Sequence, residues 1–343
     1  MMRKKIRLLL VAFFLFDASL VGFYFWGSST RLSSDEYHRE VPYASDVAEL
    51  KDTLTFMTYN IGYLSGMTNN LSVRPEREFY AENLRRAEEL MRAVDADVVG
   101  FQEIDYGSNR SYYQQQMDAM AEAGQFAYGV QAINWDRNYV PFPYWPPSAH
   151  FKRMLSGQAI LSKYPVEESQ RIVLEKPKNA PFYYNAFYLD RLVQVAQINV
   201  GRSIVVLNVH LEAFDAETRE TQARVLVDIY QEFAEKYPVI LMGDFNAPPP
   251  YATELARDEA GNLTGEKTID LFLEAGLQDA IAEVAYMADE EGNFTFSSGD
   301  PQYKLDYIFY DPDVLTPVEG RVVTEAGDIS DHLPVLMTFA FNR

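Results

Sequence analysis

The chain of 343 residues contains no cysteine. Disulfide bonds, thiolate metal sites and a cysteine nucleophile are therefore excluded, and so is anchoring through a lipidated cysteine. The chain also lacks internal repeats and low-complexity tracts, while hydrophobic residues make up 48% of it. This composition is typical of a globular protein rather than a disordered or fibrous one. The length is sufficient for one large α/β domain with a sizeable core.

Positive charge is scarce: 30 Lys and Arg residues stand against 50 Asp and Glu residues, for a formal net charge of −20. Such a surface repels polyanions at long range, and a phosphate backbone would gain no general attraction from it. This argues against a processive or tightly binding nuclease, although not against cleavage at a local site. Alternatively, the charge only maintains solubility.

The N-terminal segment has the pattern of a membrane anchor. Residues 1–7 are basic, and residues 8–26 are apolar except for Asp17 and Ser19. About 20 apolar residues in a helix cross a bilayer core, and the preceding cations place the N-terminus inside. We therefore expect residues 1–30 to anchor the rest of the chain outside the cytoplasm. The alternative is a cleaved signal peptide and a secreted protein. The long apolar run favours the anchor, although Asp17 weakens both interpretations because a carboxylate in the membrane is costly.

The rest of the chain is predicted to be a polar spacer, residues 31–52, followed by one folded domain, residues 53–343. Alternation predicts strands, and helical periodicity predicts helices over 75–94 and 216–236, the second with Asp215 as its N-cap. The predicted strands are 54–60, 98–101, 158–161, 192–198, 204–209, 239–242, 305–309 and 333–339. Many strands with few intervening helices predict an α/β fold in which two packed sheets have helices outside.

Polar side chains stand at the ends of several of these strands, and the most informative segment is Ile240–Asn246, an apolar run that ends in Gly-Asp-x-Asn. Residues two apart on a strand face the same side, so Asp244 and Asn246 leave the strand pointing the same way. A carboxylate can orient a water molecule or hold a hard cation, and an amide can donate to a phosphoryl oxygen. Alone, the pattern is a weak signal, and a capped turn explains it more readily.

Other strand ends add carboxylates, amides and histidines. The additional residues are Asn60, Gln102, Glu103, His210, Asp306, Asp331 and His332. Each has an ordinary explanation by itself; Glu103 fits a solvated loop and His210 a core histidine. Together they supply what metal-assisted phosphoester hydrolysis requires: hard oxygen ligands, a histidine–carboxylate pair and neutral donors.

The chain resembles the endonuclease/exonuclease/phosphatase superfamily, which includes deoxyribonuclease-I-like nucleases, abasic-site endonucleases, inositol polyphosphate 5-phosphatases and neutral sphingomyelinases. The matching segments occur in family order over roughly residues 53–340, and they are 58–61, 100–103, 156–162, 208–211, 243–246, 305–309 and 330–334. The resemblance implies a four-layered α/β sandwich, with two packed mixed β-sheets flanked by helices, preceded here by the N-terminal transmembrane helix.

The resemblance also implies a divalent metal cofactor, Mg²⁺ or Mn²⁺. Glu103 would be its principal ligand, with Asn60 and Asp331 near the ion. Abasic-site endonucleases carry an acidic residue two positions after the first Asn, where this chain has Gly62. This departure argues against that branch of the superfamily.

The catalytic roles follow from the same resemblance. His332 would be the general base, oriented by Asp306. Asp244 would help to position the nucleophilic water, and Asn246 would stabilise the charge of the phosphorane. His210 would contact the phosphate or assist the leaving group.

Two aromatic segments are candidates for substrate selection: residues 135–151, which are expected to form an insertion rich in Pro and aromatic residues, and residues 182–188. Exposed aromatic rings suit a membrane interface, but they could also stack nucleobases or pack on one another. The nearby cations Arg137, Lys152 and Arg153 could bind phosphate or be solvated.

The sequence therefore predicts a monomeric, membrane-tethered hydrolase, dependent on a divalent metal, that acts outside the cytoplasm. The preferred substrate is a lipid phosphodiester or a phosphorylated headgroup, because the anchor places the site at a bilayer and the acidic surface disfavours nucleic acid. A DNA or RNA nuclease is the alternative. A non-catalytic binding domain is disfavoured by the presence of Glu103, Asp244, Asn246, Asp306 and His332.

Overall fold

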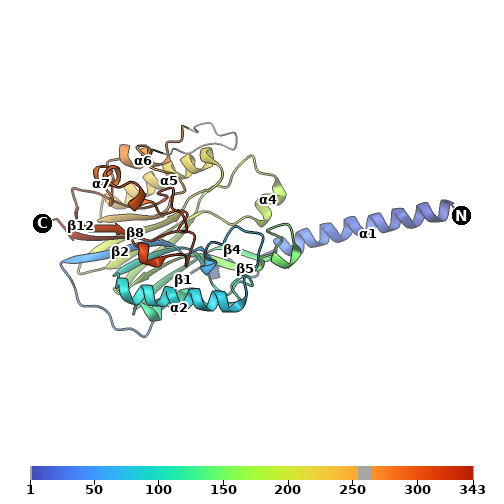
Figure 1. Ribbon diagram of the computed structural model, residues 1–343, viewed down its shortest axis with the longest axis horizontal. Helices are drawn as coiled ribbons and strands as arrows, with labels where there is room; N and C mark the ends of the chain where they lie inside the picture. The colour runs from blue at the N-terminus through green and yellow to red at the C-terminus, as the bar shows by residue number, and fades with distance from the viewer. Residues whose placement is uncertain (1, 254–264, 343) are drawn as a thin grey trace.

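The computed structural model describes residues 2–253 and 265–342. Residues 1, 254–264 and 343, which the predicted domain ranges include, lie outside the described residues. Two mixed β-sheets pack face to face with helices on their outer faces, which confirms the predicted α/β fold. Helix α1 (Met2–Ser28) projects away from this body (Figure 1).

The first sheet has seven strands within the described residues. In spatial order they are β1 (His38–Pro42), β4 (Tyr128–Val140), β5 (Lys152–Ser162), β3 (Val98–Asp105), β2 (Thr53–Asn60), β13 (Val335–Phe341) and β12 (Leu315–Val322). Strands β2 and β3 are parallel, and the other neighbours are antiparallel.

The second sheet has six strands within the same described ranges. In spatial order they are β10 (Gln278–Asp279), β11 (Asp306–Tyr310), β9 (Val239–Asp244), β8 (Ser203–His210), β7 (Leu192–Asn199) and β6 (Val166–Val173). Strands β8 and β9 are parallel, and the remaining pairs are antiparallel. The central strands are buried along their length, as their continuous apolar sequences require.

Helices α2 (Arg77–Val94) and α3 (Gln116–Ala123) pack against the first sheet, and α5 (Ala216–Ala234) and α6 (Thr268–Glu274) pack against the second. Helix α4 (Phe182–Phe187) instead contacts α1. The remaining short elements are α7 (Glu283–Ala288) and the 3₁₀ turns η1 (Ser34–Tyr37), η2 (Gly62–Leu64), η3 (Pro147–Ala149), η4 (Glu291–Asn293) and η5 (Thr324–Ala326). Helix α2 buries Tyr80, Ala87 and Met91, which are spaced to share one helical face. The backbone N–H of Thr218 donates to Asp215, which confirms that residue as the N-cap of α5.

Two sequence expectations are wrong. Residues 38–42 of the expected spacer form β1, an edge strand paired with β4. The polar sequence of β1 hides it, because this edge strand buries none of its residues completely. The aromatic segment 135–151 was expected to be an insertion, but β4 extends through it to Val140 and buries Trp135. Its exposed part is confined to the residues that follow the strand.

Helix α1 is long and apolar enough to cross a membrane, and its apolar window is not buried against the rest of the chain. The same length and composition are typical of a signal sequence near an N-terminus. Its C-terminal end contacts β4 and α4, so the helix leaves the body beside those two elements (Figure 1).

Candidate active site

One edge of the paired sheets gathers the predicted residues. Asn60, His210 and Asp244 are the last residues of β2, β8 and β9. Asp306 is instead the first residue of β11, but β11 runs antiparallel to β9 and pairs Asp306 with Asp244. Both carboxylates therefore reach the same edge, where Asp331 and His332 arrive in the loop before β13.

A histidine–carboxylate pair forms the centre of this edge. The Nδ1 atom of His332 lies 2.9 Å from Oδ2 of Asp306, and both side chains are buried. Burial disfavours the imidazolium, but the carboxylates of Asp306 and Asp244 outweigh it and raise the pKa of His332 well above its usual value. With Nδ1–H donating to Asp306, Nε2 is left to face Asp244 at 3.7 Å. This arrangement is what a histidine acting as a base requires.

Asp244 lies between the two histidines. Its Oδ2 accepts from Asn60 Nδ2 at 2.9 Å and lies 3.5 Å from His210 Nε2. Burial raises the pKa of the Asp244 carboxyl to about 6, against the opposing charge of His332. Burial and the nearby Arg191 lower the pKa of His210 well below its usual value. His210 is therefore neutral near pH 7, and it suits a hydrogen-bonding role better than that of a proton-donating acid.

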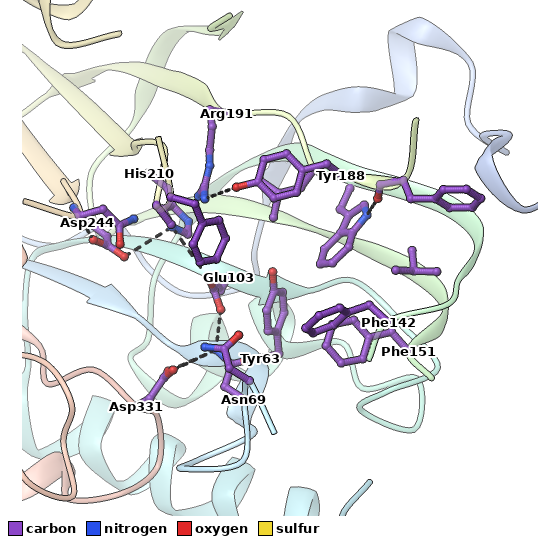
Figure 2. A pocket seen from close by; sticks show the side chains of 18 of the residues that line it. Tyr63, Asn69, Glu103, Phe142, Phe151, Tyr188, Arg191, His210, Asp244 and Asp331 are labelled. Atoms are coloured by element: carbon purple, nitrogen blue, oxygen red, sulfur yellow. Dashed lines mark hydrogen bonds and ion pairs between the residues drawn. The ribbon is translucent and has the colours of Figure 1, made fainter. Parts of the chain in front are cut away.

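Glu103 is placed by a local irregularity in β3. The pairing of β3 with β5 shifts register between Phe101 and Ile104, and Glu103 has a positive φ of 51°. A bulge of this kind redirects a side chain away from the regular alternation of the strand. Asn69 Nδ2 donates to Glu103 Oε2 at 2.9 Å and also lies 3.3 Å from both oxygens of Asp331 (Figure 2). Burial, with the Asp331 charge next, raises the pKa of Glu103 to about 7.

Sequence reasoning missed Asn69 and the residue that holds it, Arg110. The guanidinium of Arg110 donates to Asn69 Oδ1 at 2.9 Å and to Ser65 Oγ at 2.8 Å. It lies between the rings of Tyr63 and Phe151, 4.2 and 4.1 Å from their centroids. Asn69 and Arg110 lie in loops without periodicity, so the sequence contains no signal that would find them. Together they fix the amide that orients both predicted metal-ligating carboxylates.

Asn69→Ala is expected to lower turnover at a fixed Mg²⁺ concentration about 10–100-fold, the usual cost of removing a group that orients metal ligands. The physical reason is that one amide serves both Glu103 and Asp331. The measurement is the rate of phosphoester hydrolysis as a function of Mg²⁺ concentration. Asn199→Ala changes an exposed asparagine at the end of β7, outside the cleft lining, and is the matched control. Equal activity of the two variants would remove Asn69 from this role.

Of two further residues named from the sequence, Asn246 lies in the site and Gln102 does not. Asn246 lies beside Asp244, whose Oδ1 accepts its backbone N–H at 2.9 Å, while its side-chain amide donates to Leu211 O. Gln102 is not in the site. It is fully buried, and its amide donates to Asn208 Oδ1 at 2.6 Å. Because successive residues of a strand face opposite sides, Gln102 points between the sheets instead.

A cleft of about 960 Å³ extends from these residues. One end contains the carboxylates and His210, and the other is walled by Phe142 and Phe151 (Figure 2). Trp135 and Phe187 continue this wall, because the ring of Trp135 lies 6.0 Å from that of Phe151 and its Nε1 donates to Phe187 O. Arg191 lies between the two ends: it donates to Tyr188 Oη at 2.8 Å and its Nε is 3.5 Å from Glu212 Oε2. The Nη1 of Arg191 is buried and has no hydrogen-bond partner within the described part of the chain.

The combination of carboxylates at strand ends with two histidines agrees with comparisons to known proteins. The model of the endonuclease/exonuclease/phosphatase family matches residues 57–332. The chain belongs to this family. Members of the family are phosphoester hydrolases, so the predicted class of enzyme is confirmed. The recognised resemblance is confirmed with it.

Three similar proteins illustrate this membership. A UPF0294 protein of Vibrio campbellii is 26% identical over 250 residues, covering 69% of this chain and 75% of that protein. The catalytic domain of human Nocturnin is 18% identical with a TM-score of 0.58, covering 89% of this chain and 98% of that one. The mannosyl-6-phosphatase of Bacteroides thetaiotaomicron is 19% identical with a TM-score of 0.57, covering 84% and 100%. At these identities the two solved structures show the fold alone.

Family enzymes generally use divalent metals, and two groups of residues here have suitable donors. Glu103 and Asp331 place two hard carboxylates around one amide, with no cationic side chain hydrogen-bonded to either among residues 2–253 and 265–342. Asp244, Asp306 and His332 also bring ligand atoms within 4.8 Å of one another. In this second group, however, Nδ1 of His332 already bonds to Asp306. The residues present therefore fit a dication, and the first pair fits it better.

Proposed function

We propose that the protein is a membrane-tethered phosphoester hydrolase that acts, as a monomer outside the cytoplasm, on a lipid phosphodiester or a phosphorylated headgroup. The observation that carries the proposal is the meeting of the His332–Asp306 pair with Glu103, Asp331 and Asp244 at one end of the cleft. The tether would be α1, whose C-terminal end contacts the elements that wall the other end of that cleft.

Glu103 and Asp331 would be the metal ligands, and Asn60 would lie close to the ion. When bound, Mg²⁺ or Mn²⁺ would neutralise phosphoryl charge and polarise the scissile group. Asn60 donates to Asp244 through Nδ2, and its Oδ1 accepts from the N–H of Gly62. Asn60 would therefore hold Asp244 in place in addition to lying near the ion.

The remaining residues would move protons and bind charge. His332 Nε2 would accept the proton of a water molecule held against Asp244, while Asp306 stabilises the imidazolium that forms. Neutral His210 would donate a hydrogen bond to a phosphoryl oxygen. Asn246, at a positive φ of 51° beside Asp244, would donate its free amide hydrogen to the charge that develops on the phosphorane.

A substrate panel tests the proposal. The full chain in detergent micelles is assayed with Mg²⁺ and with excess chelator on sphingomyelin, phosphoinositides, plasmid DNA and RNA. We expect metal-dependent release from a lipid substrate and little cleavage of nucleic acid, because the net charge of −20 repels a polyanion. Faster cleavage of DNA or RNA would establish the nuclease alternative. Absence of turnover on every substrate, including a generic soluble phosphodiester, would support a binding domain.

A further inference from the structure

The C-terminal end of α1 is fixed to the catalytic body without a flexible linker. The ring of Phe23 lies 5.5 Å from that of Tyr139, and the ring of Tyr24 lies 5.8 Å from that of Phe182 and 5.9 Å from that of Phe187. The body also holds the backbone that follows, because Asn138 donates to Trp26 O at 3.1 Å and to Ser29 O at 3.0 Å.

The next residues continue this attachment. The backbone N–H groups of Arg31 and Leu32 donate to Oδ2 of Asp136 at 2.8 and 2.9 Å. Asp136 is completely buried and also pairs with Arg153. A helix held this way cannot rotate freely relative to the cleft, so the orientation of α1 sets the orientation of the active site.

The length of α1 sets the level at which the body meets a bilayer. Residues 8–26 span about 28 Å at 1.5 Å per residue, close to the thickness of a hydrocarbon core of about 30 Å. The outer boundary then lies near Trp26, and Phe23 and Tyr24 lie within one helical turn of it. Their ring partners on the body, Phe182 and Phe187, must lie at the same level. Aromatic residues are typical of this interfacial zone.

Phe187 connects that boundary with the active-site cleft. It contacts Phe23 and Tyr24 of α1, and it is also part of the aromatic wall. Exposed rings surround this end of the cleft, and Phe182 and Trp145 have 75% and 77% of their surface exposed. The aromatic end of the cleft therefore opens where α1 would leave the membrane. In Figure 1, α4 lies beside the base of α1, and α7 lies on the opposite side of the body.

The chemistry of this wall suits an apolar chain. Its side chains are mainly aromatic and aliphatic, and two of their polar atoms are already bonded within the protein: Trp135 Nε1 donates to Phe187 O at 2.8 Å, and Tyr188 Oη donates to Glu212 Oε1 at 3.0 Å. An acyl chain that lies along these rings has no hydrogen bonds to water to lose. The wall therefore accepts the apolar part of a lipid.

Two of the nearby cations already bond to backbone carbonyl groups of the protein. Arg137 donates to Ala186 O at 2.7 Å, and Lys176 donates to Tyr188 O at 2.9 Å. Contact with the membrane would thus depend on apolar rings rather than on attraction to anionic headgroups, and a zwitterionic bilayer is sufficient for it.

We infer that the aromatic rim, formed by Tyr144, Trp145, Phe182 and Tyr183, docks on the bilayer crossed by α1, and that the cleft takes its substrate directly from that bilayer. The phosphoester would reach Glu103 and His332 while the acyl chains remain along the aromatic wall. This inference rests on the proposed function for its chemistry, but the docking itself is independent of catalysis.

The absence of cysteine permits a direct test of docking. Trp145→Cys, Phe182→Cys and the control Val284→Cys, on α7, each introduce the single thiol of the chain for a polarity-sensitive fluorophore. In full-length protein reconstituted into phosphatidylcholine vesicles, labels at positions 145 and 182 are expected to shift their emission to the blue. A nitroxide lipid is expected to quench them, and the label at 284, where Val284 is 83% exposed, is expected to be unaffected. Identical behaviour at all three positions would overturn the docking.

A second measurement tests lipid entry. Trp145 and Phe182 lie outside the cleft lining. The double variant Trp145→Ser, Phe182→Ser is expected to lose about tenfold or more of its turnover on vesicle phospholipid, because each ring contributes apolar area to the interface. Its turnover of a soluble phosphodiester is expected to equal that of Val284→Ser. Equal losses on both substrates would overturn entry from the bilayer. Failure of hydrolysis altogether would refute the proposed function, while the labels would still decide the docking.

Discussion

His332→Ala is expected to reduce turnover by about 10²–10⁴-fold, the contribution usual for a positioned general base. The expectation depends on geometry: Asp306 occupies Nδ1 at 2.9 Å, which leaves Nε2 facing Asp244 and the cleft. The measurement is kcat at saturating Mg²⁺. His38→Ala, a histidine on the distant edge strand β1, is the matched control. Near-normal turnover of His332→Ala would exclude the proposed base.

The pH profile gives a second outcome for the same residue. A base works when it is neutral, and the carboxylates around His332 raise its pKa well above the usual value. Turnover should therefore rise with pH through that raised pKa and fall on its acid side. Asp306→Asn removes one of the charges that stabilise the imidazolium, so the acid limb should move to lower pH. An acid limb that stays in place would show that another group controls it.

Stability must be measured alongside these rates. Asp306 is completely buried, and its second oxygen has no hydrogen-bond partner within the described residues. His332→Ala leaves this carboxylate without its partner, which costs about 3–5 kcal/mol for a buried pair. The double variant His332→Gln, Asp306→Asn removes the buried charge and should recover most of the Tm. It should remain as inactive as the single variant, which separates the loss of the base from unfolding.

The sequence located these strand ends well because each end follows a local apolar pattern. Apolar runs stop at Asn60, His210 and Asp244, and each of these is the last residue of its strand. Periodicity also located α2 and α5. The order of strands within the sheets depends on long-range pairing, such as Asp306 with Asp244, and no local pattern specifies it.

Other parts of the site were beyond prediction for physical reasons. The bonds of Asn69 to two carboxylates and to Arg110 join three separate loops, so neither residue carries a periodic signal. Alternation predicts that Glu103 and Gln102 face opposite sides, but only the bulge with its positive φ explains how Glu103 reaches the cleft. Trp135 was expected to belong to a Pro-rich insertion, whereas it packs against Tyr63 and Phe151 and donates to Phe187 O.

Glu103→Gln is the second substitution with a large expected effect. Glu103 and Asp331 share one amide, and burial together with the Asp331 charge raises the pKa of Glu103 to about 7. Two close carboxylates repel each other, and a dication would relieve that repulsion. Gln keeps the shape of the side chain but holds a hard cation poorly. Since a metal contributes several kcal/mol of transition-state stabilisation, turnover should fall about 10²–10³-fold, with partial recovery at high Mg²⁺.

A thermal measurement separates metal binding from catalysis in this variant. In the absence of metal, Glu103→Gln should melt at the same temperature as the wild type or slightly above it, because it removes a buried charge beside Asp331. Mg²⁺ at 100 times its Kd should stabilise the wild type by about 2.7 kcal/mol and therefore raise its Tm. It should raise the Tm of Glu103→Gln far less. Glu167→Gln, an exposed carboxylate on β6, is the control and should respond like the wild type. If Glu103→Gln kept both the Mg²⁺-dependent rise and full turnover at low Mg²⁺, Glu103 would have no place in the metal site, and the cation would belong with Asp244, Asp306 and His332 instead.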